Sequence, residues 1–140
     1  MSIQVVLLPV FVLIALTFGL FFWMGSRRIA SIRRGETRIK DIALGQQNWP
    51  PHATQIANAF HNQLELPVLY YVVTIFALLT RNADYMFVLM AWVFVASRLV
   101  HAYIFVTSNH VPNRFTAYVV GAVILLLIWV ILAARVLSVL

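Results

Sequence analysis

Two long uncharged runs limit what this chain can fold into. Residues 3–24 and 115–134 contain no charged side chain, and each is about as long as the ~20 helical residues that cross a ~30 Å hydrocarbon core. The chain is 63% hydrophobic and 10% charged, whereas soluble domains are roughly half apolar and a quarter charged. We therefore predict an integral membrane protein. The first run has no basic segment before it and is too long for a signal peptide, so we expect it to be retained.

The hydropathy pattern predicts an all-α membrane protein, a four-transmembrane-helix bundle that forms a single domain of residues 1–140. We expect its helices at residues 3–25, 53–80, 85–107 and 113–137. Pro67 falls inside the second helix, where its missing N–H and its ring should produce a kink near the Gln63 carbonyl. Residues 26–52 connect the first two helices, and their pattern fits a short interfacial helix or a solvated linker equally well.

The basic side chains are concentrated in this first loop. They are Arg27, Arg28, Arg33, Arg34, Arg38 and Lys40, and only Glu36 and Asp41 accompany them. In so apolar a chain, such a cluster indicates a cytoplasmic loop beside anionic lipid rather than a nucleic-acid site. The positive-inside rule therefore predicts that both termini lie outside and that residues 26–52 and 108–113 lie in the cytoplasm.

The sequence contains no cysteine, which excludes disulfides, thiolate metal ligands and a cysteine nucleophile. We expect no metal site. Any thiol chemistry at this protein would have to be supplied by a bound small molecule.

Polar side chains of all the predicted helices fall at one depth, near the cytoplasmic end. The second helix carries Asn58, Asn62 and Glu65 at i, i+4 and i+7, which places them on one stripe, with His61 one turn before Glu65. The other helices contribute Arg27 and Arg28, then Arg98, His101 and Phe105, and finally Arg114 and Tyr118. The opposite ends of the helices are almost purely apolar.

Each of these residues also has a purely structural interpretation. Glu65 and Arg98 are expected to form an ion pair, because a charge within a membrane needs a partner whatever the function. His101 is equally compatible with a packed core histidine, and Arg28 and Arg114 with arginines that reach toward headgroups. The number of polar groups at one depth nevertheless exceeds what one ion pair requires. It favours a site for a small zwitterionic or anionic ligand.

The same residues resemble the MAPEG family, the membrane-associated proteins of eicosanoid and glutathione metabolism. Its second-helix pattern, an asparagine, a glutamate three residues later and often a proline soon after, matches Asn62-Gln63-Leu64-Glu65-Leu66-Pro67. Its third-helix arginine and histidine match Arg98 and His101. The arginine that opens its fourth helix matches Arg114, nine residues after Phe105. The span count and loop lengths also agree, so the resemblance covers essentially the whole chain.

This resemblance implies a homotrimer that binds glutathione between neighbouring subunits near the cytoplasmic face. The residues expected at the glutathione site are Asn62, Glu65, Arg98, His101, Tyr118, His61 and Arg28. Asn62 and Glu65 would hold amino or amide groups of the peptide, and Arg98 would brace Glu65. Arg114 would be the catalytic residue, because a cation beside the sulfur favours the thiolate over the thiol.

The sequence also departs from the family pattern. Asn58 and His61 stand where glutathione-using members have an arginine, and Phe105 stands where they have a tyrosine. The chain is therefore identified as a divergent, bacterial-type member, expected in an inner membrane.

Three functions remain open. The first is a glutathione transferase-like or peroxidase-like enzyme that acts on lipophilic electrophiles. The second is a non-catalytic protein of the same fold that binds another anionic ligand or a lipid. The third, a small transporter, is disfavoured because no charge lies near the midplane of the first or fourth helix.

Overall fold

The computed structural model describes residues 1–140 and contains helices but no strand. The elements in chain order are α1 (Ile3–Arg33), η1 (Ile39–Asp41), α2 (Pro51–Asn62), α3 (Leu66–Leu79), α4 (Tyr85–Val106) and α5 (Val111–Leu137). Counting α2 and α3 as one span, four helical segments are long and apolar enough to cross a membrane. The prediction of an all-α chain with four spans is confirmed.

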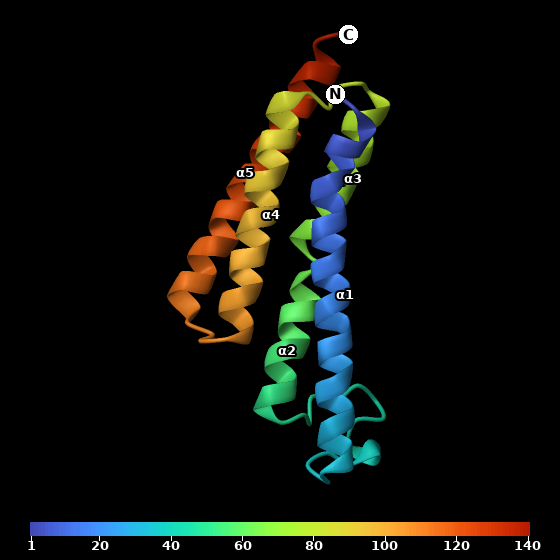
Figure 1. The fold of residues 1–140 in the computed structure, drawn as a ribbon, viewed down its shortest axis with the longest axis vertical. Helices are drawn as coiled ribbons and strands as arrows, with labels where there is room; N and C mark the ends of the chain where they lie inside the picture. Colours follow the sequence, from blue (N-terminus) through green and yellow to red (C-terminus); the bar gives the residue numbers. More distant parts are fainter.

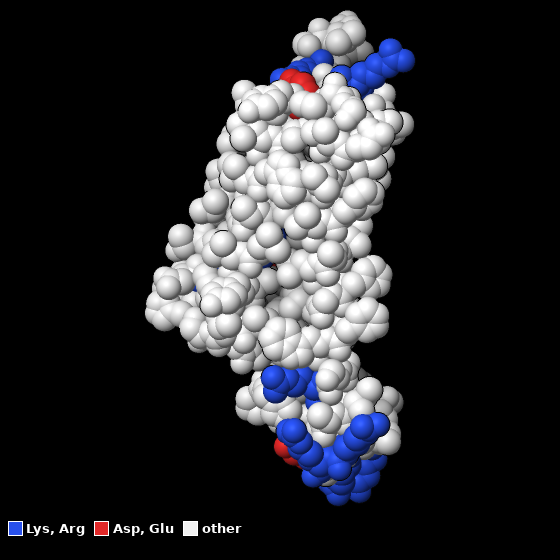
Figure 2. All heavy atoms as spheres, viewed as in Figure 1, with Lys and Arg blue, Asp and Glu red and all other residues white.

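The helices run along one long axis (Figure 1). Helix α1 packs against α2, α3 and α4, and helix α5 packs against α3 and α4. Both termini lie at one end of the bundle, and the connection between α1 and α2 lies at the other. Figure 2 shows basic side chains gathered at this second end, a smaller charged group at the end with the termini, and an almost uncharged band between them.

Helix α1 is longer than the expected span of residues 3–25. It has 31 residues, or about 46 Å at 1.5 Å per residue, against a hydrocarbon core of about 30 Å. The arginines after Met24 end the apolar run but not the helix, because arginine is a good helix former. The helix ends at Arg33, and Gly35, two residues later, has a φ of +74°. The N–H groups of Gly35 and Glu36 donate to the carbonyls of Ile32 (3.1 Å) and Ser31 (3.0 Å), which is the Schellman pattern.

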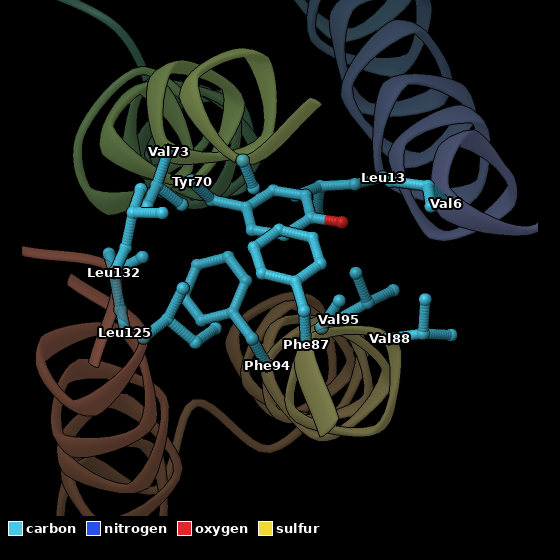
Figure 3. Close-up of a cluster of buried hydrophobic side chains, with 13 residues drawn as sticks. Val6, Leu13, Tyr70, Val73, Phe87, Val88, Phe94, Val95, Leu125 and Leu132 are labelled. Atoms are coloured by element: carbon cyan, nitrogen blue, oxygen red, sulfur yellow. The ribbon is translucent and has the colours of Figure 1, made fainter. Parts of the chain in front are cut away.

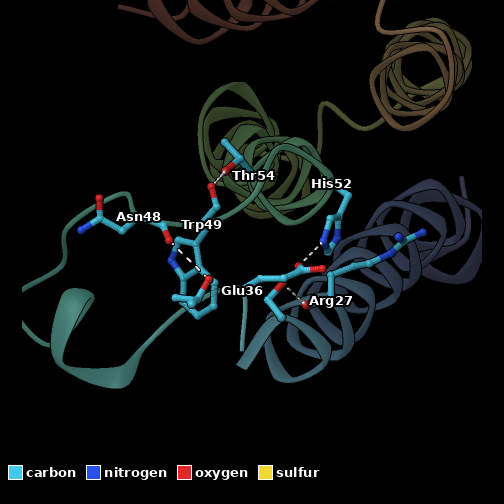
Figure 4. A network of polar contacts seen from close by, with 8 residues as sticks. Arg27, Glu36, Asn48, Trp49, His52 and Thr54 are labelled. Atoms are coloured by element: carbon cyan, nitrogen blue, oxygen red, sulfur yellow. Dashed lines mark hydrogen bonds and ion pairs between the residues drawn. The ribbon is translucent and has the colours of Figure 1, made fainter. Parts of the chain in front are cut away.

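The connection after α1 is neither the interfacial helix nor a free linker. Its only helical turn is η1, and it is tied back onto α1 and α2 (Figure 4). His52 Nε2 lies 2.9 Å from Glu36 Oε2, and the hydroxyl of Thr54 donates to the Trp49 carbonyl. The guanidinium of Arg28 lies 4.9 Å from the Trp49 ring centroid.

The second span is interrupted at the position where Pro67 predicts a kink. α2 ends at Asn62 and α3 begins at Leu66, so the kink expected in the helix over 53–80 is a short break between two helices of one span. Across the break, the N–H groups of Gln63, Leu64 and Glu65 donate to the carbonyls three residues earlier, at 2.9, 3.0 and 3.3 Å. Pro67 explains this, because it has no N–H to donate to Gln63 and its ring crowds that carbonyl.

The main hydrophobic core lies in the half of the bundle near the termini. Tyr70 of α3 and Phe94 of α4, whose ring centroids are 5.0 Å apart, pack there with Leu13 of α1 and Leu125 of α5. Figure 3 shows these side chains filling the space between the four helices. The other half contains only two small apolar clusters. The bundle is therefore densely packed at one end and leaves room for a cleft at the other.

Asp84 closes the packed end. It is the N-cap of α4, where its carboxylate accepts a hydrogen bond from the Phe87 N–H at 2.9 Å. Its second oxygen lies 2.7 Å from Arg135 Nη1 at the end of α5. The backbone hydrogen bond from Phe87 and the Arg135 guanidinium hold the pKa of the Asp84 carboxyl below its usual range. One carboxylate thus caps α4 and joins it to α5.

We expect Asp84→Ala to lower the free energy of unfolding by about 1 kcal/mol, the usual cost of losing an N-cap. Asp84→Asn keeps a cap and should cost less, because it loses only the partly exposed ion pair. Since folding lowers the pKa, the stabilisation is complete above the unfolded value of about 3.9 and is lost as pH falls through the folded value. Melting curves in detergent should show this acid-induced loss in the wild type and not in Asp84→Asn.

Candidate binding cleft

A cleft of about 430 Å³ opens between α2 on one side and α4 and α5 on the other. This volume is in the range of small-molecule sites. The residues that line it are Asn58, His61, Asn62, Glu65, His101, Phe105, Val111, Arg114, Phe115 and Tyr118. Six of the side chains expected at a ligand site therefore meet in one cavity of a single chain: His61, Asn62, Glu65, His101, Arg114 and Tyr118.

The α2 wall ends in a carboxylate without a partner. Glu65 is exposed and lies in the break between α2 and α3, where its backbone leaves helical geometry (φ −97°, ψ −109°). None of the three ion pairs of the chain includes it. On the same wall, Asn62 donates from its amide to the Asn58 carbonyl at 3.2 Å. The acceptor oxygens of Glu65 thus remain free to bind a cationic or N–H group.

The opposite wall carries a cation held in place. Arg114 lies in the first turn of α5, and its guanidinium carbon lies 4.2 Å from the centroid of the Phe105 ring. Its Nη1 donates a hydrogen bond to the Asn109 side-chain oxygen in the turn between α4 and α5. The cleft therefore has a negative group on α2 and a positive group on α5.

Arg98 does not pair with Glu65, so the expected ion pair is wrong within the chain. Its side chain is 1% exposed, and Nη2 donates to the carbonyls of Ala117 (3.0 Å) and Tyr118 (3.2 Å) on α5. The guanidinium also lies over the Tyr118 ring, 5.0 Å from its centroid. A carbonyl oxygen has two lone pairs, so helix carbonyls can accept this second bond. Arg98 lies behind the cleft wall and supports Tyr118.

Gly121 makes this placement of Arg98 possible. A Cβ atom at Gly121 would lie 2.6 Å from Arg98 Nη2 and 2.5 Å from the Ser97 hydroxyl oxygen. Both distances are too short for non-bonded atoms. The guanidinium can reach the α5 backbone only because residue 121 has no side chain.

His101 lies at the base of the cleft and is 3% exposed. Its ring centroid is 5.6 Å from that of Phe105 and 5.7 Å from that of Tyr118. The two interpretations of this residue are therefore compatible, since the ring is packed among aromatic neighbours and also lines the cavity.

Arg28 does not line the cleft of its own chain. It lies on the part of α1 beyond the apolar run, against Trp49 of the loop. Within one subunit, the structure therefore does not support Arg28 as a ligand-binding residue.

Gln55 and Asn109 were missed by the sequence analysis, although both shape the cleft. Gln55 of α2 donates to the carbonyls of Phe105 (2.7 Å) and Thr107 (3.4 Å) at the end of α4. Asn109 has a positive φ of 50°. An asparagine between two helices is a known signal for this left-handed conformation, whereas the role of Gln55 depends on a contact between distant segments.

The fold and the cleft define a small four-span membrane protein with a polar, ligand-sized cleft at one end. The chain belongs to the MAPEG family, whose family model matches residues 6–134. This match covers every residue of the cleft and confirms the resemblance noted in the sequence. A search of curated proteins and a search of solved structures each returned no match.

We expect Gly121→Ala to destabilise the protein by about 1–3 kcal/mol, the usual cost of overpacking a buried site. Gly19 of α1 is the matched control, because a Cβ there meets nothing within 4 Å. Gly19→Ala should leave the melting temperature unchanged or raise it slightly, since alanine is the better helix former. Equal melting temperatures for the two variants in detergent would contradict the close contact between Arg98 and α5.

Proposed function

We propose that this protein is a glutathione-dependent membrane enzyme of the transferase or peroxidase type that acts on lipophilic electrophiles. One observation carries the proposal: a free carboxylate, Glu65, and an immobilised guanidinium, Arg114, line opposite walls of one cleft. Glutathione has a cationic amine and anionic groups on one small molecule, so it matches this distribution of charge. The MAPEG family, to which the chain belongs, includes glutathione-dependent enzymes.

In this proposal the α2 wall binds the peptide. Glu65 accepts hydrogen bonds from the amine, which also gives the carboxylate the partner that it lacks within the chain. Asn62 and His61 contact the peptide amide and carboxylate groups. His101 and Tyr118 line the base, and Arg98 acts through Tyr118 and does not contact the ligand.

Arg114 is the proposed catalytic residue. A guanidinium beside the sulfur lowers the pKa of the thiol, so a larger fraction of bound glutathione is thiolate at neutral pH. With an aryl halide, the thiolate sulfur forms a bond to the electrophilic carbon and the halide leaves with its bonding electrons. The thiol proton leaves to solvent through the open cleft.

We further propose that the protein acts as a homotrimer in a bacterial inner membrane, with the termini outside and the cleft at the cytoplasmic leaflet. The basic end of the molecule supports this orientation (Figure 2). In a trimer, Arg28 would contribute to the cleft of a neighbouring subunit. Phe115, which is 65% exposed at the rim of the cleft, provides an apolar route by which the electrophile enters from lipid.

A second candidate function is non-catalytic binding of another anionic ligand or a lipid. The residues at 58 and 61 favour it, because Asn58 and His61 leave Arg114 as the only arginine that lines the cleft. Glutathione has two carboxylates, and a single arginine beside the sulfur leaves both of them without a permanent cation in this chain.

The first test compares Arg114→Ala with Arg114→Lys, using purified protein, glutathione and a chromogenic aryl halide. We expect the alanine variant to lose at least about tenfold in kcat/KM, equivalent to about 1.4 kcal/mol of transition-state stabilisation. Lysine keeps the charge without the planar donor group and should retain part of the activity. Wild-type activity in Arg114→Ala would refute the proposed catalytic role.

The second test separates the two candidate functions by thermal stability in detergent. A ligand at 100 times its Kd stabilises the folded state by about 2.7 kcal/mol, so glutathione should raise the melting temperature. Glu65→Gln, which removes the charge and keeps the shape, should abolish most of this shift. No shift of the wild type at millimolar glutathione would favour the second candidate.

A further inference from the structure

We propose that Asn109 and Phe105 are positioning residues that hold the Arg114 guanidinium with its unused N–H groups facing the bound sulfur. This inference rests on the proposed function, because it concerns the cation that stabilises the thiolate. It adds two side chains that do not contact the sulfur themselves and that the proposed mechanism has not used.

Neighbouring side chains hold one part of the Arg114 guanidinium, and the other part is free. One face lies on the Phe105 ring at 4.2 Å, and Nη1 donates to the Asn109 oxygen. The Arg114 side chain makes no other hydrogen bond within the chain and lies on the cleft wall. A guanidinium has five N–H donors in a fixed plane, so holding one nitrogen and one face determines where the remaining donors point.

Arg114 needs such support because of where it lies. It is in the first turn of α5, where the helix dipole presents its positive end and disfavours a cation. A long arginine side chain at a helix end would otherwise extend toward solvent or headgroups. The ring face of Phe105 and the oxygen of Asn109 both attract the guanidinium and keep it at the cleft.

The support is itself rigid. Asn109 adopts the left-handed conformation, which asparagine tolerates better than most residues. Its N–H donates to the Ile104 carbonyl at 2.7 Å and closes a six-residue turn at the end of α4. Gln55 of α2 binds the Phe105 carbonyl at 2.7 Å from the other side. The support for the cation is thus tied to the helix that leads to Glu65.

The chemistry of residue 109 fits this role. The neutral amide oxygen orients the guanidinium and leaves its charge available to the ligand. A carboxylate at the same place would form a close ion pair and neutralise part of that charge. Asparagine and aspartate have nearly the same shape and both tolerate a positive φ, so Asn109→Asp tests the charge with little change in the turn.

The experiment measures the pKa of the glutathione thiol bound to the full-length protein, from the ultraviolet absorbance of the thiolate as pH is varied. We expect Asn109→Asp and Phe105→Leu each to raise this pKa by about one unit, which is a tenfold smaller thiolate-to-thiol ratio. Phe105→Tyr keeps the ring face and should restore a value near that of the wild type. Arg114→Ala should raise the thiol pKa by the largest amount.

S-methylglutathione distinguishes positioning from a general structural defect. It has no thiol to ionise, so Asn109→Asp, whose side chain does not line the cleft, should bind it with a Kd within about twofold of the wild type, well under the tenfold of a 1.4 kcal/mol change. Weakened binding of this analogue, in proportion to the change in thiol pKa, would overturn the inference in favour of a merely structural role.

The remaining outcomes separate this inference from the proposed function. If Arg114→Ala raises the thiol pKa but Asn109→Asp and Phe105→Leu do not, the positioning role is wrong and the proposed function stands. If Arg114→Ala leaves the thiol pKa unchanged, or the wild type holds no thiolate, the proposed function fails and this inference fails with it.

Discussion

A guanidinium buried among apolar helices needs hydrogen-bond acceptors, and the acceptors that Arg98 finds on α5 organise the cleft. Arg98 uses the carbonyls of Ala117 and Tyr118, which joins α4 to α5 and places the Tyr118 side chain at the base of the cavity. Gly121 provides the space for this contact. Arg98 Nη1 has no hydrogen-bond partner within the chain, but no ion pair joins the guanidinium to Glu65, and the Glu65 carboxylate is left free on the facing wall. The two charged groups that remain available in the cleft, Glu65 and Arg114, therefore come from opposite walls.

The two halves of the bundle also differ because the membrane interior contains no water. Apolar side chains fill the half near the termini (Figure 3), and Asp84 with Arg135 joins its helix ends. The half near the loop has fewer buried contacts and carries the ionisable groups. The main packed core and the polar cleft thus lie toward different ends of the same helices.

The sequence was sufficient to predict the features that depend on local pattern. Uncharged runs located the spans, Pro67 located the distortion of the second span, and helical spacing brought Asn62, Glu65 and Arg114 to one depth. The sequence was not sufficient to predict which of several possible partners a polar side chain binds. Arg98 had both a carboxylate and backbone carbonyls within the expected layer, and only the packing of α5 against α4 decides between them. The same holds for Gln55, whose partners Phe105 and Thr107 lie 50 and 52 residues away.

The break at residues 63–65 divides the second span into two helices with different neighbours. Short three-residue turns replace the helical hydrogen-bond ladder there. The packed core is attached to α3, whereas α2 forms one wall of the cleft. The break therefore divides one span between two parts of the molecule, since α3 belongs to the packed core and α2 to the polar cleft.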